Sequence, residues 1–142
     1  MKNYVCGNAG VNWFIGSGDV LYIEAGELNR DDSWKNWCSR IREICVIPHD
    51  NFDKLILPED SKMLFSGLSS LTDIDAAMFD TGNVNDMGGM FSGCTSLQNL
   101  DLTSFNTGRV ENMANMFNDC INLKNVNLAG FDASHVTSFR SM

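Results

Sequence analysis

A 26-residue repeat runs through the second half of the chain and limits the fold more than any other sequence feature. Segments 79–104 and 105–130 share eleven identical positions, nearly all of them apolar or turn residues. The recurring apolar positions are Phe79, Phe105 and Phe131; Val84, Val110 and Val136; Met87 and Met113; Met90 and Met116; Cys94 and Cys120; Leu97 and Leu123; Leu102 and Leu128. A unit this short buries its apolar residues only by stacking on its neighbours, so equivalent residues form ladders. The repeat therefore predicts a solenoid.

Each unit carries the signature of a leucine-rich repeat. Leu97, Leu100 and Leu102 follow the L-x-x-L-x-L pattern, and the alternation predicts short parallel strands at 74–76, 100–102 and 126–128. Apolar groups at i, i+3 and i+4 within 113–117 predict a short helical turn on the convex side. The expected fold class is therefore an α/β leucine-rich-repeat solenoid over residues 61–142, with an incomplete last repeat.

Residues 1–60 do not follow the repeat, and we interpret them as an N-terminal cap that covers the end of the solenoid. Two β-rich runs, 13–15 and 20–23, flank a Gly-rich turn and predict a hairpin. Segments 45–47 and 54–58 are expected to be extended. A helix is expected between the hairpin and segment 45–47, with N-caps at Asp31, Asp32 and Ser33 and an apolar face of Trp34, Trp37, Cys38, Ile41 and Ile44. The three tryptophans are expected mostly in the core; a tryptophan platform for a ligand is the alternative.

The chain has five cysteines, an odd number, so at least one is unpaired in a monomer. Cys94 and Cys120 share a register with Leu68, which indicates an apolar interior position where a free thiol acts as a small hydrophobe. A reactive thiol or a disulfide between the two is the alternative. The redox states of Cys6, Cys38 and Cys45 stay open.

No pattern for catalysis, a metal or a cofactor stands out. His49 follows Pro48 in an expected loop, and His135 occupies a repeat turn where the other units have Asn83 and Arg109. With two histidines and no CxxC pair, a zinc site is not expected. We therefore expect no enzyme activity and no cofactor. A calcium site at Asp73 and Asp75 is the remaining metal hypothesis, although the next units place Asn99 and Asp101 and then Asn125 and Asn127 there.

The candidate binding residues are the outward positions of the expected strands, because the concave face of a solenoid is its usual binding surface. They are Asp73, Asp75, Asn99, Asp101, Thr103, Asn125 and Asn127. This polar, mildly acidic set favours a basic or hydrogen-bonding protein partner; a solvated sheet face without a partner is the alternative. The net charge of −8 argues against nucleic acid. No apolar stretch is long enough to span a membrane, and the N-terminus lacks the apolar region of a signal peptide.

The repeat resembles that of the BspA-like leucine-rich-repeat family of bacterial surface proteins. The family motif, L-x-x-L-D-L-S-x-F-D-T-S-x-V-x-x-M-x-x-M-F-x-x-C, is similar to residues 97–120, and the similarity covers about 63–142. The segment before such repeats is also similar to this chain at Trp13, Ile15, Leu21, Ile23 and Trp34. The resemblance implies a secreted or cell-surface protein of adhesion or host interaction, without catalytic residues.

The leading functional hypothesis is therefore a non-catalytic protein-interaction module of the bacterial cell surface. An intracellular binding protein, such as an inhibitor or immunity protein located in the cytoplasm, is the alternative. The last repeat stops before the equivalents of Phe117 and Cys120, which leads to a further expectation. We expect this end to expose apolar residues and to self-associate; the residues are Leu123, Val126, Leu128, Phe131 and Val136.

Overall fold

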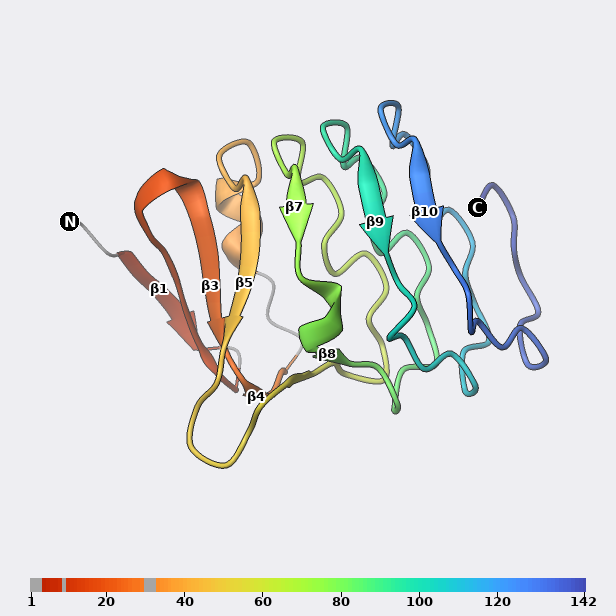
Figure 1. Cartoon of the computed structure of the whole chain (residues 1–142), viewed down its shortest axis with the longest axis horizontal. Coiled ribbons are helices and arrows are strands. Elements are labelled where there is room, and N and C mark those ends of the chain that lie inside the picture. Colours follow the sequence, from red (N-terminus) through yellow and green to blue (C-terminus); the bar gives the residue numbers. More distant parts are fainter. Residues whose placement is uncertain (1–3, 9, 30–32) are drawn as a thin grey trace.

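The computed structural model describes residues 4–8, 10–29 and 33–142, and these form a solenoid whose coils stack along the long axis of the molecule (Figure 1). The strands are β1 (Tyr4–Asn8), β2 (Asn12–Ile15), β3 (Val20–Glu24), β4 (Gly26–Glu27), β5 (Glu43–Ile47), β6 (Leu55–Ile56), β7 (Asp73–Ile74), β8 (Phe79–Asp80), β9 (Asn99–Asp101) and β10 (Asn125–Asn127). Short 3-10 helices span Ser17–Asp19, Ser33–Trp37 and Ala76–Met78. The predicted solenoid is confirmed.

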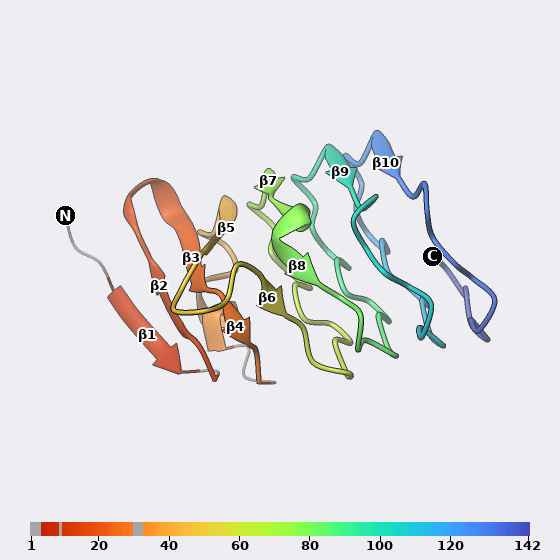
Figure 2. The same ribbon diagram turned by 60° about the horizontal axis from the view of Figure 1, so that its bottom comes forward.

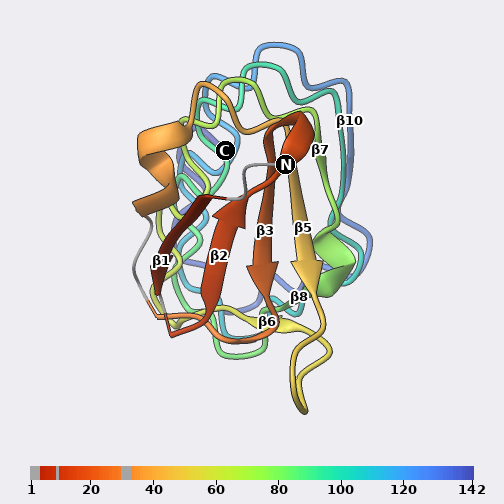
Figure 3. The same ribbon diagram turned by 90° about the vertical axis from the view of Figure 1, so that its left-hand side faces the viewer.

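Three lines of parallel pairing hold the coils together. The largest sheet has the order β1-β2-β3-β5-β7, and β9 pairs with β10 further along the same side (Figure 1). A second sheet, β4-β6-β8, forms another side, as Figure 2 shows. A third line consists of single parallel bridges that join Asp60, Asp86, Asn112 and Ser138 in turn. Viewed along the stack, the coils lie behind one another (Figure 3).

The N-terminal segment continues this architecture. The expected hairpin is confirmed, because β2 and β3 pair antiparallel with Trp13 opposite Ile23. Strand β3 then pairs parallel with β5, and β5 pairs parallel with β7 of the first repeat. The sheet therefore passes without interruption from the non-repeating segment into the repeats.

The expected helix in this segment is wrong. Over residues 33–44, the structure forms the short 3-10 helix Ser33–Trp37 in its place, and Asp31 and Asp32 lie outside the described residues. Ile44, which fits the helical spacing, lies in β5. There Ile44 and Val46 both point toward the core. Since β5 has a partner strand on each side, ladder hydrogen bonds outweigh the helical pattern of the side chains.

The convex side contains turns instead of the expected helical turns, so the fold is a β-solenoid and the predicted α/β class is wrong in its helical part. Within 113–120, Met116 and Asn118 donate backbone bonds to the residue three before each of them. Asn115 has φ +58°, a left-handed conformation that ends any right-handed helix. Left-handed residues recur at the same register along the repeats: Met63, Gly89, Asn115 and Ser141, and Gly67, Gly93 and Asp119.

Hydrogen bonds between coils replace helical bonds on this side. The N–H groups of Met87, Gly89, Phe91 and Gly93 donate to carbonyls 25 residues ahead, at 2.8–3.0 Å. Every second residue takes part, as in a parallel sheet. Met113, Met116 and Phe117 therefore lie in a succession of tight turns, and their spacing does not correspond to a helix.

The expected strands of the repeats exist, but each begins one residue earlier than predicted. The alternation itself is correct: Ile74 and Leu100 point into the core and are at most 9% exposed. Asp75 already leads into the 3-10 helix Ala76–Met78 and lies outside β7. The inward and outward assignment of the side chains is unaffected.

Aromatic ladders form much of the core. The rings of Phe79, Phe105 and Phe131 follow each other at 6.5 Å, which confirms the predicted ladder. A second ladder joins Phe65, Phe91 and Phe117 at 6.0 and 6.2 Å. Trp34 extends this second ladder into the N-terminal segment at 6.3 Å from Phe65, and Trp13 packs on Trp34 at 5.9 Å.

Two of the tryptophans confirm the core prediction. Trp13 and Trp34 are 1% and 0% exposed, so neither ring offers a platform to a ligand. Trp37 is half-buried and packs against the same core.

Cys94 and Cys120 are free thiols on successive coils. The Cys94 thiol donates to the carbonyl of Phe65 at 3.3 Å, and that of Cys120 donates to Phe91 at 3.1 Å. Cys94 is fully buried and Cys120 half-buried, so the predicted burial is confirmed for Cys94 and holds in part for Cys120. Burial, with a smaller effect of neighbouring Cys120, raises the pKa of Cys94 to about 12.

Candidate functional site

The seven candidate residues occupy one exposed side of the solenoid, over β7, β9 and β10. We call them the strand face: Asp73, Asp75, Asn99, Asp101, Thr103, Asn125 and Asn127, all of them exposed. Five of these side chains line a hollow of about 550 Å³ with a floor of Ile74, Leu100 and Val126. Asp75 and Thr103 line an adjoining hollow of about 160 Å³, which shares Asp101 with the first. The structure thus brings all seven residues together.

The pairing of the strands explains this arrangement. In the parallel register of β9 and β10, Asn99 faces Asn125, Leu100 faces Val126 and Asp101 faces Asn127. Because side chains alternate along a strand, the apolar member of each strand enters the core and its two polar neighbours point outward. The amide of Asn125 donates to the Oδ1 atom of Asn99 at 2.8 Å, which links the two coils through their side chains at the hollow.

Asp101 is the best-defined acidic group of the strand face. Its Oδ1 atom accepts a bond from the Thr103 hydroxyl at 2.7 Å and another from the Thr103 N–H at 3.0 Å. These bonds lower the pKa of Asp101, with the hydroxyl as the larger cause. The carboxylate is therefore ionised at neutral pH and is held in one orientation by the turn that follows β9.

Sequence reasoning missed Lys124, the single basic residue in the lining of the larger hollow. It directly precedes β10, and its N–H donates to the carbonyl of Gln98 in the previous coil at 2.8 Å. Extending the 26-residue register by one position beyond the strands would have included it. The hollow therefore combines carboxylates, amides and one ammonium group, a composition suited to hydrogen bonding with a polar surface.

The histidines lie away from the strand face. His49 lies in the loop between β5 and β6, with its Nε2 atom 3.2 Å from Asp50 Oδ2. His135 is exposed in a turn, where its Nδ1 atom is 3.2 Å from the Ser134 hydroxyl. Over residues 4–8, 10–29 and 33–142, the structure places no three His, Cys, Asp or Glu side chains where they could hold a metal ion together.

A second hollow, of about 560 Å³, lies in the N-terminal segment and was not foreseen from the sequence. Its residues come from three separate stretches, 10–12, 24–29 and 49–52. No periodic pattern links these stretches, so only the folded structure reveals that they meet.

The coils with their exposed polar face define a β-solenoid repeat protein. A family model described as "Mycoplasma protein of unknown function, DUF285" matches residues 59–142, more than half of the chain, and the chain belongs to this family. Searches of curated proteins and of solved structures found no match. In the described part of the chain, no helix has the length and apolar character needed to cross a membrane.

Proposed function

We propose that this protein is a non-catalytic protein-interaction module and that the strand face binds its partner. The observation that carries this proposal is the convergence of seven outward polar side chains on two adjoining hollows. Concave surfaces of this kind are where solenoid proteins bind other proteins. The exposed carboxylates favour a partner with a basic or hydrogen-bonding surface.

The resemblance to BspA-like leucine-rich-repeat proteins supports the cellular setting of the proposal. In that setting the protein is secreted or displayed on the bacterial cell surface, and it takes part in adhesion or host interaction. We also propose that the protein is a member of the BspA-like leucine-rich-repeat family. The alternative is a cytoplasmic inhibitor or immunity protein, and the binding experiment distinguishes this alternative from a cell-surface protein.

A binding assay with a matched pair of variants tests the strand face. Asp101→Asn alters a carboxylate that lines both hollows, and Asp132→Asn alters a carboxylate that lines neither of them. Asp132 also caps the residue two positions on, with a bond of 2.9 Å from the Ser134 N–H, and its pKa is likewise lowered by Ser134. The two substitutions therefore perturb the fold similarly, and only the first removes charge from the strand face.

The protein is immobilised and exposed in parallel to purified host matrix proteins and to a bacterial cytoplasmic lysate. We expect a matrix protein to bind the wild type and Asp132→Asn, and to bind Asp101→Asn and a combined Asn99→Ala, Asn125→Ala variant much more weakly. Equal binding by all variants would place the contact elsewhere on the molecule. Capture of one cytoplasmic protein that depends on Asp101 would favour the inhibitor hypothesis.

A further inference from the structure

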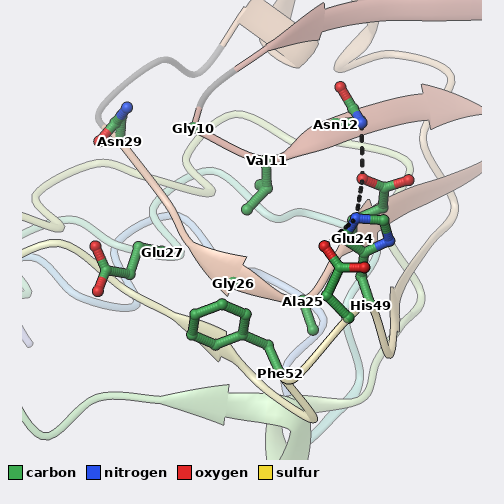
Figure 4. Close-up of a pocket in the computed structure, with 11 residues that line it drawn as sticks. Gly10, Val11, Asn12, Glu24, Ala25, Gly26, Glu27, Asn29, His49 and Phe52 are labelled. Atoms are coloured by element: carbon green, nitrogen blue, oxygen red, sulfur yellow. Dashed lines mark hydrogen bonds and ion pairs between the residues drawn. The ribbon is translucent and has the colours of Figure 1, made fainter.

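The hollow in the N-terminal segment, here called the cap pocket, is a separate site from the strand face. It lies beside β4, between the turn that precedes β2 and the loop between β5 and β6 (Figure 4). Its volume of about 560 Å³ falls within the range of about 300–1,000 Å³ that ligand pockets have. None of its lining residues belongs to the repeats, so its chemistry is independent of the strand face.

One part of the cap pocket is apolar. Figure 4 shows Val11 and Phe52 on either side of Gly26. A Cβ atom on Gly26 would lie 2.9 Å from Val11 Cγ1 and 3.9 Å from Phe52 Cδ2, so Val11 packs directly on the glycine, and position 26 carries no side chain that would cover the Phe52 ring. Phe52 is 40% exposed, unusually for a large apolar residue of this protein. The pocket therefore offers a partly exposed aromatic surface in its lining.

The other part is acidic. Asn12, Glu24 and His49 gather at one end in Figure 4. Glu24 Oε2 accepts a bond from the Asn12 amide at 2.8 Å and lies 3.9 Å from His49 Nε2. The Glu24 side chain is only 24% exposed, and Asp50 stands beside His49. Among the described residues, the lining includes three carboxylates and no Lys or Arg, and the half-buried carboxylate of Glu24 contacts an amide and an imidazole.

We propose that the cap pocket binds an arginine side chain presented by a partner protein. The methylene stem of arginine packs against Val11 and Phe52, and the guanidinium pairs with Glu24 and Asp50. Long basic side chains lay an apolar stem on apolar surface while their charged end reaches a polar partner. The planar guanidinium also suits the ring of Phe52 and carboxylate oxygens better than an ammonium does.

The chemistry of the pocket excludes the opposite class of ligand. An anionic group would meet the carboxylates of Glu24, Glu27 and Asp50, and the described lining residues include no Lys or Arg to offset the repulsion. A purely apolar ligand would fill the space at Phe52 but would bury Glu24 further from water without a new partner, which is costly. A cation with an apolar stem satisfies both parts of the pocket.

A titration followed by amide resonances tests this inference. The probe is N-acetyl-arginine methylamide, and its control is the citrulline analogue, which has nearly the same shape without the charge. We expect saturable shifts at the backbone amides of Gly26, His49 and Phe52 with the arginine probe, and none with citrulline. Equal shifts with both probes, or shifts confined to the strand face, would overturn the proposal.

Variants then separate the groups that hold the probe. Glu24→Gln is expected to weaken binding about tenfold, the usual effect of losing a charge-assisted bond. The Asp50 side chain is 75% exposed, so we expect Asp50→Asn to leave folding unchanged and to weaken binding as well. Asp101→Asn, which removes charge from the strand face, should leave the arginine titration unchanged. Unchanged affinity in both Glu24→Gln and Asp50→Asn would refute the site even if the strand face binds a partner.

Discussion

The hydroxyl of Thr107 forms two hydrogen bonds with the backbone of Asp132 in the next coil. It accepts a bond from the Asp132 N–H at 2.8 Å and donates one to the Asp132 carbonyl at 3.1 Å. Thr81 repeats the arrangement with Asn106 one coil earlier. Both threonines are buried, at 1% and 2% exposure, so a single side chain takes the place of a strand bond at this corner of the solenoid.

Thr107→Val should therefore destabilise the protein although it preserves shape. The variant leaves the Asp132 N–H and carbonyl without their partner, which we expect to lower the free energy of unfolding by about 1–3 kcal/mol. Thr107→Ser keeps the hydroxyl and loses one methyl group, so its cost should be nearer 1 kcal/mol. Urea denaturation of the two variants measures their free energies of unfolding and shows which substitution costs more. A larger loss of stability in Thr107→Ser would show that packing of the methyl group matters more than the hydrogen bonds.

Phe105 is the central ring of its ladder, and its removal should be severe. The ring is 3% exposed and lies 6.5 Å from both Phe79 and Phe131. Phe105→Ala leaves a cavity between two coils and should cost about 3–5 kcal/mol of unfolding free energy. Thermal denaturation measures the effect. Phe139→Ala, at a residue that is 48% exposed, serves as the control and should change the melting temperature little.

The buried thiol of Cys94 links stability to alkaline pH. Its pKa is raised from 9.0 to about 12 by burial, so the unfolded chain loses this proton at lower pH than the folded chain does. The stabilisation by the protonated thiol is therefore complete below pH 9 and is lost as pH rises toward 12, by up to about 1.4 kcal/mol per pH unit. Cys94→Ala should show a shallower alkaline decline in urea denaturation than the wild type.

Thiol labelling provides a separate check on this ladder. Folded protein should react slowly at Cys94 with a thiol reagent, because the thiolate is disfavoured and buried. The half-buried Cys120, whose pKa is also raised by burial, should react faster than Cys94. Rapid labelling of Cys94 under native conditions would contradict the burial described here.

The 26-residue register predicted the fold well wherever side chains alone decide it. The ladders of Phe79 and Cys94 and the outward position of Asp101 all follow from equivalent residues stacking on each other. The helical elements failed because spacing at i, i+3 and i+4 also fits successive turns. The deciding signal was at Gly89 and its equivalent Asn115, a glycine and an asparagine that adopt left-handed φ values and end any helix.

The two candidate sites also differ in how far the sequence predicts them. The strand face could be predicted because one register and one alternation place Asn99, Asp101 and Asn125 on the same side. The cap pocket could not, because Glu24 and His49 are 25 residues apart in a segment without a repeat. Their proximity depends on the parallel pairing of β3 with β5, a long-range contact that local patterns do not encode.

The coil formed by residues 123–142, here called the end coil, presents the apolar residues that other coils bury. Leu123, Leu128 and Phe131 are half-buried, whereas their equivalents one coil earlier are at most 3% exposed: Leu97, Leu102 and Phe105. Val126 and Val136 are half-buried in the same way, and within the described residues β10 pairs with β9 alone. An apolar surface with an unpaired strand edge is suited to being covered by another coil.

We therefore expect the polypeptide of residues 1–142 to self-associate through the end coil as its concentration rises. Two copies related by a two-fold axis would bring the same surfaces together and close the assembly. Light scattering over a concentration series measures the association. Phe139→Lys, at a residue of the end coil that is 48% exposed, should abolish it by placing a charge in the contact. Phe52→Lys alters a residue of the N-terminal segment with a similar exposure, 40%, and should leave the association unchanged. A monomer at every concentration, or equal effects of the two variants, would show that the end coil does not bind a second copy.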